Sequence, residues 1–323
     1  MKKLVAPGLV ILAGLVFIVI TFAQNLFSVG SAFEEMITDF RPALQDETIA
    51  TYRADIAGLG AVANEFQTAV LPGLAQALGQ TEEDLRALLD SQFPAVAQGM
   101  ALLPEAGPQF AGLIDTLADQ QSNFASADAI PTTEFVAQTV PWGFVIVGLI
   151  AIGFGIWMIA KGTRLSAILA AMLGALIVIG SFVLSLPGKS ADADDLNEAL
   201  EPIYTVQTIE SAKGALTVIG AMGTEMGTAM MPGLGLMLQM DADTLNGFLA
   251  QNFPATAAAL QTFPETMVRF AGLVNTFDAN LDNYETLKPV KFTPIIWTFI
   301  AGGFLIFVGG ALGFVSKKDE QTS

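Results

Sequence analysis

Four stretches of the chain are apolar from end to end, and they set the framework for everything else. Residues 4–23, 141–160, 165–186 and 294–315 contain no Asp, Glu, Lys or Arg. Each is close to the roughly 20 residues that a helix needs to cross the hydrocarbon core of a bilayer. The pattern predicts four transmembrane helices that separate two long segments, 24–140 and 187–293.

The two long segments show the periodicity of amphipathic helices. Apolar residues recur at intervals of three and four, as in Ile56, Leu59, Val62 and Phe66, whereas strand-like alternation is absent. Prolines punctuate the first segment, and we expect each to start a helix: Pro42, Pro72, Pro94, Pro104 and Pro108. We therefore predict an all-α protein, with four to five helices in each long segment.

The chain matches itself, without a gap, over much of the two long segments. The run Leu71–Leu74 falls on Met231–Leu234, and at the same offset Phe93-Pro94-Ala95 falls on Phe253-Pro254-Ala255. Such self-similarity predicts a tandem duplication, with repeat 1 at residues 1–160 and repeat 2 at residues 161–323. Each repeat contains a span, a helical lobe and a second span. The proline that opens the second span suggests that repeat 2 is seven residues shorter, because Pro141 then corresponds to Pro294.

Both repeats enter the membrane from the same side. They are parallel repeats related by a pseudo-two-fold axis along the membrane normal, and the expected assembly is a four-helix membrane bundle with two outside lobes. The short turn between 160 and 165 makes the second and third spans antiparallel neighbours.

Basic residues fix the expected orientation. Lys and Arg flank the spans at the two termini and in the short turn between spans two and three: Lys2, Lys3, Lys161, Arg164, Lys317 and Lys318. Short segments rich in Lys and Arg stay on the cytoplasmic side, so we predict cytoplasmic termini and two extracytoplasmic lobes in the cell membrane. An alternative interpretation of residues 1–23 is a signal peptide cleaved after Ala23, although its apolar run is longer than a typical signal core.

The lobes carry the excess negative charge of a chain whose net charge is −17. A surface of this kind repels nucleic acid and anionic lipid, so nucleic acid is not an expected partner. The chain contains neither histidine nor cysteine. This excludes His-based acid–base catalysis, cysteine nucleophiles and ordinary zinc sites, and no phosphate or dinucleotide motif is present. We predict a protein that is not an enzyme and carries no cofactor.

Two acidic features are open to two interpretations. Asp192, Asp194, Asp195 and Glu198 have a spacing that suits a hard cation such as Ca²⁺, but they are also compatible with a solvated helix start. Asp241 corresponds to Thr81, which forms a capping box with Asp84, so we interpret Asp241 as a helix cap.

Glu65 and Glu225 occupy the same position in the two repeats. They are candidates for a pair of acids that face each other across the pseudo-axis as an ion or proton site. The alternative is that both lie on a solvated face.

Glycines replace ionisable groups within the spans. The absence of charge there argues against ion-coupled pumping. Small residues let helix backbones approach closely, so we predict helix packing at Gly148, Gly153, Gly309 and Gly313. The same glycines also suit self-association.

The run from Phe93 to Glu105, the run Phe110–Leu113 and the run from Asn123 to Pro131 resemble segments of uncharacterised bacterial four-span membrane proteins with duplicated helical outside domains. The resemblance covers mainly the lobes and implies no activity.

Three functions are compatible with these observations. The first is a cell-envelope component whose acidic helical lobes mediate assembly or scaffolding with a membrane or envelope protein, or with a second copy. The second is binding or transport of a lipid or other apolar molecule in a groove between the lobes. The third is a sensor subunit that requires a separate transducer.

Overall fold

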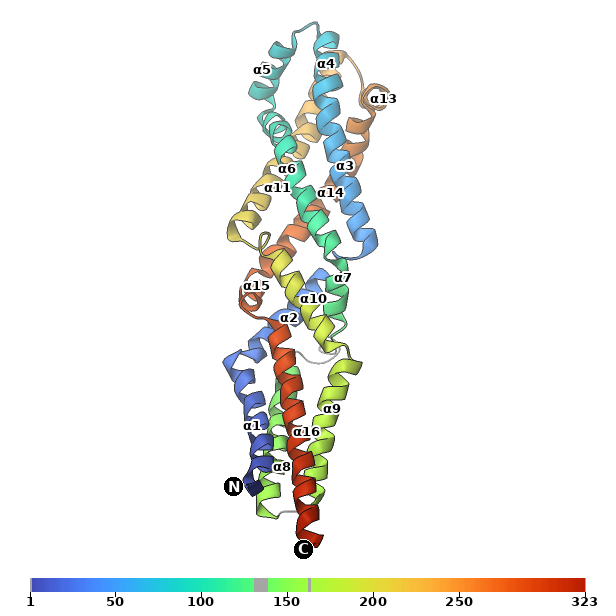
Figure 1. The fold of residues 1–323 in the computed structure, drawn as a ribbon. Coiled ribbons are helices and arrows are strands. Elements are labelled where there is room, and N and C mark those ends of the chain that lie inside the picture. Colours follow the sequence, from blue (N-terminus) through green and yellow to red (C-terminus); the bar gives the residue numbers. More distant parts are fainter. Residues whose placement is uncertain (1, 131–138, 162–163, 323) are drawn as a thin grey trace. The chain divides into compact units, whose positions relative to one another are not determined.

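A computed structural model describes residues 2–130, 139–161 and 164–322 (Figure 1). Within these ranges most of the backbone is helical, and it contains no strand. The all-α prediction is confirmed. The chain forms two compact units, and each contains residues from both halves of the sequence. Unit 1 comprises residues 1–39, 120–201 and 282–323, and unit 2 comprises residues 40–119 and 202–281. These units cut across the predicted repeat boundary at residue 160.

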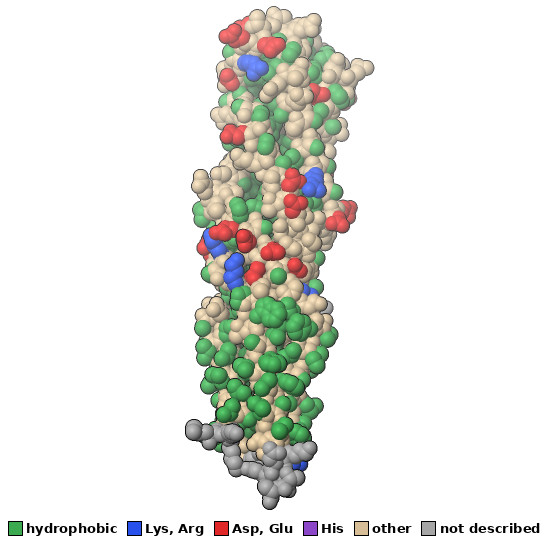
Figure 2. Space-filling model, in the orientation of Figure 1, with side chains coloured by type: hydrophobic (Ala, Val, Ile, Leu, Met, Phe, Trp, Pro, Cys, Tyr) green, Lys and Arg blue, Asp and Glu red, His purple; other side chains and the backbone are tan. Residues whose placement is uncertain are grey.

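Unit 1 holds the four apolar helices: α1 (Lys2–Ala23), α8 (Thr139–Ala160), α9 (Arg164–Val183) and α16 (Phe292–Thr322). Among the described residues, four helices are long and apolar enough to cross a membrane, and they coincide with the four predicted spans. On the side of these helices that Figure 2 shows, hydrophobic side chains predominate, as expected for a surface that contacts lipid. The third span ends before its predicted boundary at residue 186. Helix α9 stops at Val183 because Ser185 adopts a left-handed backbone conformation with a φ of 55°.

The four spans form a ring in which each helix has two neighbours. Helix α1 packs against α8 and α16, and α9 packs against α16 and α8. Val10, Ala13 and Phe17 of α1 are fully buried in the core of this bundle. Helix α1 is thus an integral part of the packing, which favours a retained first span over a cleaved signal peptide.

Glycines lie where these helices come closest. A Cβ atom at Gly148 of α8 would lie 2.7 Å from the carbonyl oxygen of Gly14, and one at Gly174 would overlap the backbone of Gly303 and Phe307. Gly14 aligns with Gly174 when the sequence is matched to itself, so their respective contacts with Gly148 and Gly303 make residue 148 equivalent to residue 303. Matched in this way, the segment from Gly174 to Gly303 is five residues shorter than the segment from Gly14 to Gly148, whereas the correspondence of Pro141 with Pro294 gives a difference of seven.

The glycines predicted to pack behave in two ways. Gly148, Gly309 and Gly313 each lie against a neighbouring helix, so that an added Cβ would meet other atoms within 3 Å. Gly153 has open space around it and is exposed. The prediction that Gly153 packs against another helix of the chain is therefore wrong. The residue lies on the outward face of α8, where no other helix of the described chain approaches.

Four further helices complete unit 1: α2 (Leu26–Phe40), α7 (Gln121–Asp128), α10 (Leu186–Leu200) and α15 (Leu281–Leu287). Helix α10 packs against α7, α9 and α16. Tyr284 of α15 is buried and donates a hydrogen bond of 2.9 Å to the carbonyl oxygen of Asn197. Its burial raises the pKa of the phenol to about 12.

Unit 2 is built from two similar series of helices. The first is α3 (Asp46–Glu65), the π-helical segment η1 (Phe66–Val70), α4 (Leu71–Leu78), α5 (Glu82–Gln92) and α6 (Pro94–Asp119). The second is α11 (Val206–Glu225), the π-helical segment η2 (Met226–Met230), α12 (Met231–Leu238), α13 (Ala242–Asn252) and α14 (Pro254–Ala279). Every bound in the second series lies beyond its counterpart in the first by one constant offset, the same offset that aligns the sequence with itself. This correspondence supports the predicted duplication.

The four long helices of unit 2 also form a ring. Helix α3 packs against α6 and α14, and α11 packs against α14 and α6. Each series therefore contacts the other along two faces. The residues expected to form two separate lobes pack into a single unit.

The helix caps agree with the sequence prediction. The Thr81 hydroxyl accepts a hydrogen bond from the backbone of Asp84, whose carboxylate completes the capping box. Asp241 accepts one of 2.8 Å from the backbone N–H of Thr244. The hydrogen bonds from Thr244 hold the pKa of Asp241 below its ordinary value.

The prolines follow the prediction only in part. Pro94 starts α6, but Pro104 and Pro108 lie inside that helix, and Pro42 lies in a turn. Both internal prolines are exposed and are four residues apart, so they share the solvent side of α6. Water on that side can satisfy the carbonyl groups that each proline leaves without a partner, which lets the helix continue.

The glycine contacts of the membrane bundle lead to a testable prediction. Gly174→Ala should lower the free energy of unfolding by about 1–3 kcal/mol, because the added methyl group overlaps the backbone of α16. Gly180→Ala is the matched control, since Gly180 lies on the same helix in open space. We expect it to be neutral or slightly stabilising. Thermal unfolding of the full chain in lipid nanodiscs measures both, and equal effects of the two variants would contradict the close contact.

Candidate functional site

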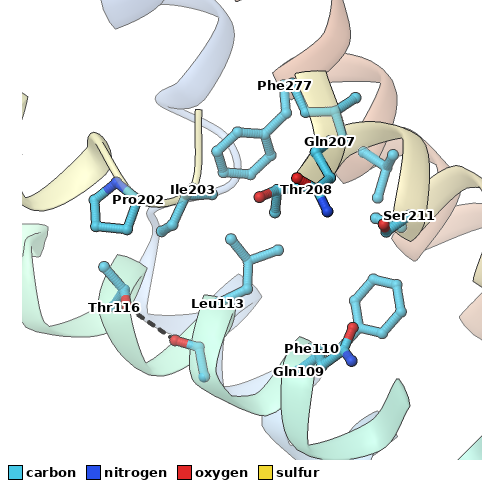
Figure 3. A pocket seen from close by; sticks show the side chains of 14 residues that line it. Gln109, Phe110, Leu113, Thr116, Pro202, Ile203, Gln207, Thr208, Ser211 and Phe277 are labelled. Carbon is cyan, nitrogen blue, oxygen red and sulfur yellow. Dashed lines mark hydrogen bonds between the residues drawn. The ribbon is translucent and has the colours of Figure 1, made fainter. Parts of the chain in front are cut away.

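A pocket of about 560 Å³ opens in unit 2 between α6 and the first turns of α11, with α14 behind it. Its buried wall consists of Phe110, Ile209, Val274 and Phe277. In Figure 3 the side chain of Leu113 extends from α6 toward α11, between the rings of Phe110 and Phe277. The volume lies within the range of small-molecule sites.

Polar groups surround the opening but none of them is charged. Gln109, Gln207, Thr208 and Ser211 lie at the exposed edge. No ionisable side chain is among the residues that line the pocket, which are Gln109, Phe110, Gly112, Leu113, Thr116, Pro202, Ile203, Gln207, Thr208, Ile209, Ser211, Ala212, Val274 and Phe277. An apolar pocket with a neutral polar edge suits an uncharged molecule.

Local sequence features create the opening. Thr205 caps α11, because its hydroxyl accepts a hydrogen bond of 3.1 Å from the backbone N–H of Thr208. This fixes the start of α11 beside the turn at Pro202 and Ile203. Across the pocket, the Thr116 hydroxyl donates to the carbonyl oxygen of Gly112 at 2.9 Å and is thereby held along α6 (Figure 3). Gly112 and Ala212 contribute little side-chain volume, which leaves the space empty.

On the corresponding face between α3 and α14, a large side chain occupies the position of Ala212, and a smaller pocket of about 240 Å³ lies farther along the same two helices. Tyr52 is the counterpart of Ala212 in the self-alignment; its side chain is buried, and its ring lies 5.5 Å from that of Phe270. This burial raises the pKa of the Tyr52 hydroxyl above its ordinary value. Phe270 is the counterpart of Phe110.

An ion pair joins α3 and α14 on the same face. Asp55 of α3 accepts two hydrogen bonds from the Arg269 guanidinium of α14, at 2.8 and 2.7 Å, and a third from the Thr266 hydroxyl at 3.1 Å. The Asp55 side chain is only 11% exposed. On the pocket side the counterparts of this pair are Ala215 and Gln109, so no equivalent ion pair exists there.

The paired acids Glu65 and Glu225 bind helix ends. The Glu65 carboxylate accepts hydrogen bonds from the backbone N–H groups of Ala255 at 3.2 Å and Thr256 at 2.7 Å. Glu225 accepts one from Val96 at 2.8 Å. Each acid therefore caps the first turn of the long helix in the other half, α14 or α6, where four N–H groups lack intrahelical partners. This role accounts for both carboxylates without a bound ion or a transferred proton.

The four acids proposed as a weak metal site serve separate purposes. Asp194 accepts hydrogen bonds from the backbone of Phe292 at 2.7 Å and Thr293 at 3.0 Å, and so caps α16. Asp192 accepts one from Ser126 of α7, Glu198 lies 3.9 Å from Lys291, and Asp195 is exposed. Among the described residues, no group of three or more acidic side chains is placed to hold a metal ion. The expectation of a solvated helix start is also wrong, because α10 begins at Leu186 and Asp194 lies in its middle.

The pocket was not predicted from the sequence. The difference that produces it is visible in the self-alignment. The tyrosine at position 52 aligns with the alanine at position 212, and the arginine at position 269 aligns with the glutamine at position 109. A difference of this kind becomes a cavity only if the surrounding helices keep the same arrangement. That arrangement is visible only in the structure.

Comparison with known proteins adds no identification. No protein-family model matches the chain, and no curated protein matches it.

The crossed caps yield a prediction for unit 2. Glu65→Gln and Glu225→Gln should each lower the free energy of unfolding by about 1 kcal/mol, because each removes a negative charge from a helix N-terminus. Glu105→Gln is the control, since Glu105 is exposed within α6 and lies away from a helix end. Chemical denaturation of the full chain measures the three variants. A loss with Glu105→Gln as large as with the other two would contradict the capping role.

Proposed function

We propose that this chain is a membrane-anchored binding protein that holds a neutral, mainly apolar small molecule in the pocket of unit 2. The observation that carries the proposal is the pocket itself: about 560 Å³, with aromatic and aliphatic walls and no ionisable group among its lining residues. The absence of acids, bases and nucleophilic pairs from this lining supports binding over catalysis. Of the functions expected from the sequence, the pocket favours the uptake of an apolar molecule over assembly or scaffolding.

The proposal includes the tandem duplication. It is supported by the recurrence of helix bounds at one constant offset, by the two π-helical segments at equivalent positions and by the crossed caps of Glu65 and Glu225. A duplicated helical unit brings two copies of one surface together. Small changes in either copy then suffice to open a site between them.

The proposal also includes a topology. Both segments of unit 2 are flanked by spans, so four crossings leave them on one side of the membrane and the two termini on the other. The basic residues beside the span ends, such as Lys161 and Arg164, favour the cytoplasmic side for the termini. Unit 2 is then extracytoplasmic and meets its ligand outside the cell membrane.

Ligand binding can be tested with small fluorinated apolar compounds. A fluorine NMR screen of the full chain in nanodiscs should detect compounds whose signals broaden beyond their values with empty nanodiscs. Leu113→Glu should weaken their binding at least about tenfold, because it places a charge in the apolar pocket. Leu102→Glu is the matched control: Leu102 is half-buried on the same helix and does not line this pocket. The absence of any binding compound, or equal losses in both variants, would refute the proposed function.

The topology can be tested because the chain has no cysteine of its own. Single cysteines at Glu83, which is exposed in unit 2, and at Lys161, between the second and third spans, provide one reporter on each side. A membrane-impermeant maleimide added to intact cells should label Glu83→Cys. It should label Lys161→Cys only after permeabilisation. The reverse pattern would contradict the proposed orientation.

A further inference from the structure

We infer that the ligand of unit 2 is a neutral molecule built on an aromatic ring with a small polar substituent, of the kind that a phenol represents. The inference rests on the proposed function, and it specifies the chemical class of the ligand. Its basis is that the pocket occupies the place where the other half of unit 2 holds the side chain of Tyr52.

The two faces are comparable helix by helix. On the closed face, α3 packs against α14 and Tyr52 of α3 lies against Phe270 of α14. On the open face, α11 packs against α6, with Ala212 and Phe110 at the equivalent positions. Ala212 therefore leaves space beside Phe110 at the position where the other face has the ring of Tyr52 beside Phe270. The side chain of Tyr52 therefore indicates the kind of group that fits beside Phe110.

The walls of the pocket favour a ring over a flexible chain. Phe110 and Phe277 both line it, and both are part of larger aromatic clusters: Phe110 packs edge-on against Phe270 at 5.3 Å, and Phe277 packs against Phe40 at 4.9 Å and Tyr204 at 5.0 Å. These contacts hold both rings in fixed orientations. A rigid aromatic ligand can pair with them in the offset or edge-on geometries that aromatic groups prefer, whereas an alkyl chain gains no such directional contact.

The polar edge selects for a neutral substituent. The Tyr52 hydroxyl lies in the field of Arg269 and Asp55, whereas the equivalents of these residues on the open face are Gln109 and Ala215. Gln109, Gln207 and Ser211 supply amide and hydroxyl groups that both donate and accept hydrogen bonds. They suit a hydroxyl or carbonyl group and provide no counter-ion for a charged one. The volume of about 560 Å³ exceeds that of a single ring, so substituents beyond the ring are also accommodated.

The test compares an aromatic with an aliphatic ring of similar size. Fluorine NMR titrations of the full chain in nanodiscs would use 4-fluorophenol and 4,4-difluorocyclohexanol, each corrected for partition into empty nanodiscs. We expect 4-fluorophenol to bind at least about tenfold more tightly than the aliphatic alcohol. Ala212→Tyr should abolish binding because it restores the residue of the first half. Ala221→Tyr, at an exposed position on the same helix, should leave binding unchanged.

Two further variants extend the test, and a folding measurement accompanies all of them. Ala212→Leu fills the pocket with a smaller side chain and should also weaken binding, and thermal unfolding of every variant identifies any that fails to fold. Tyr52→Ala removes the ring from the other face and should add a binding site for 4-fluorophenol between α3 and α14.

The outcomes separate the inference from the proposed function. Equal affinity for the two probes, with loss of both in Ala212→Tyr, would overturn the aromatic selectivity and leave the binding function intact. Binding of neither these probes nor any compound of the apolar screen would overturn both. Binding that persists in folded Ala212→Tyr would place the ligand elsewhere and refute the inference.

Discussion

The helices of each half of this chain pack against one another and against the helices of the other half. In unit 2, α3 and α6 of the first half form two sides of a ring that α11 and α14 of the second half complete. The spans of unit 1 follow the same rule, because α1 and α8 are closed by α9 and α16. An amphipathic helix with one unpartnered stripe is unstable in water. The halves of unit 2 therefore depend on each other to bury these faces, whereas the spans of unit 1 contact one another for packing rather than for shielding from water.

The crossed caps strengthen this dependence. Glu65 of the first half binds the start of α14 in the second half, and Glu225 of the second half binds the start of α6 in the first half. Both acids immediately precede the π-helical segments η1 and η2. A π-turn alters the direction in which the following side chains leave the helix and is frequent at specialised positions. The N-terminus of each long helix, which is the most polar part of its backbone, is thereby satisfied within the contact between halves.

Sequence patterns predicted the parts of the fold that depend on local composition. Uninterrupted apolar runs defined the four spans within a few residues, and capping chemistry located the starts of α5 and α13 at Thr81 and Asp241. Prediction failed where tertiary contacts decide. Pro104 and Pro108 looked like helix boundaries, but exposure of their side of α6 removes the cost of the missing hydrogen bonds. The partners of Glu65 and Asp194 lie 190 and 98 residues away, so no local pattern contains them.

The candidate site follows from the same interdependence of the halves. A ring of four helices made from two similar series has two equivalent contacts between them, at α3–α14 and at α6–α11. The first is closed by the ring of Tyr52 and by the ion pair of Asp55 with Arg269. The ring and the ion pair stabilise this first contact, whereas the second contact has alanine and glutamine at the equivalent positions. A ring made of two similar series can in this way keep a large side chain at one of two equivalent contacts and a small one at the other, which accounts for the pocket of about 560 Å³ at α6–α11.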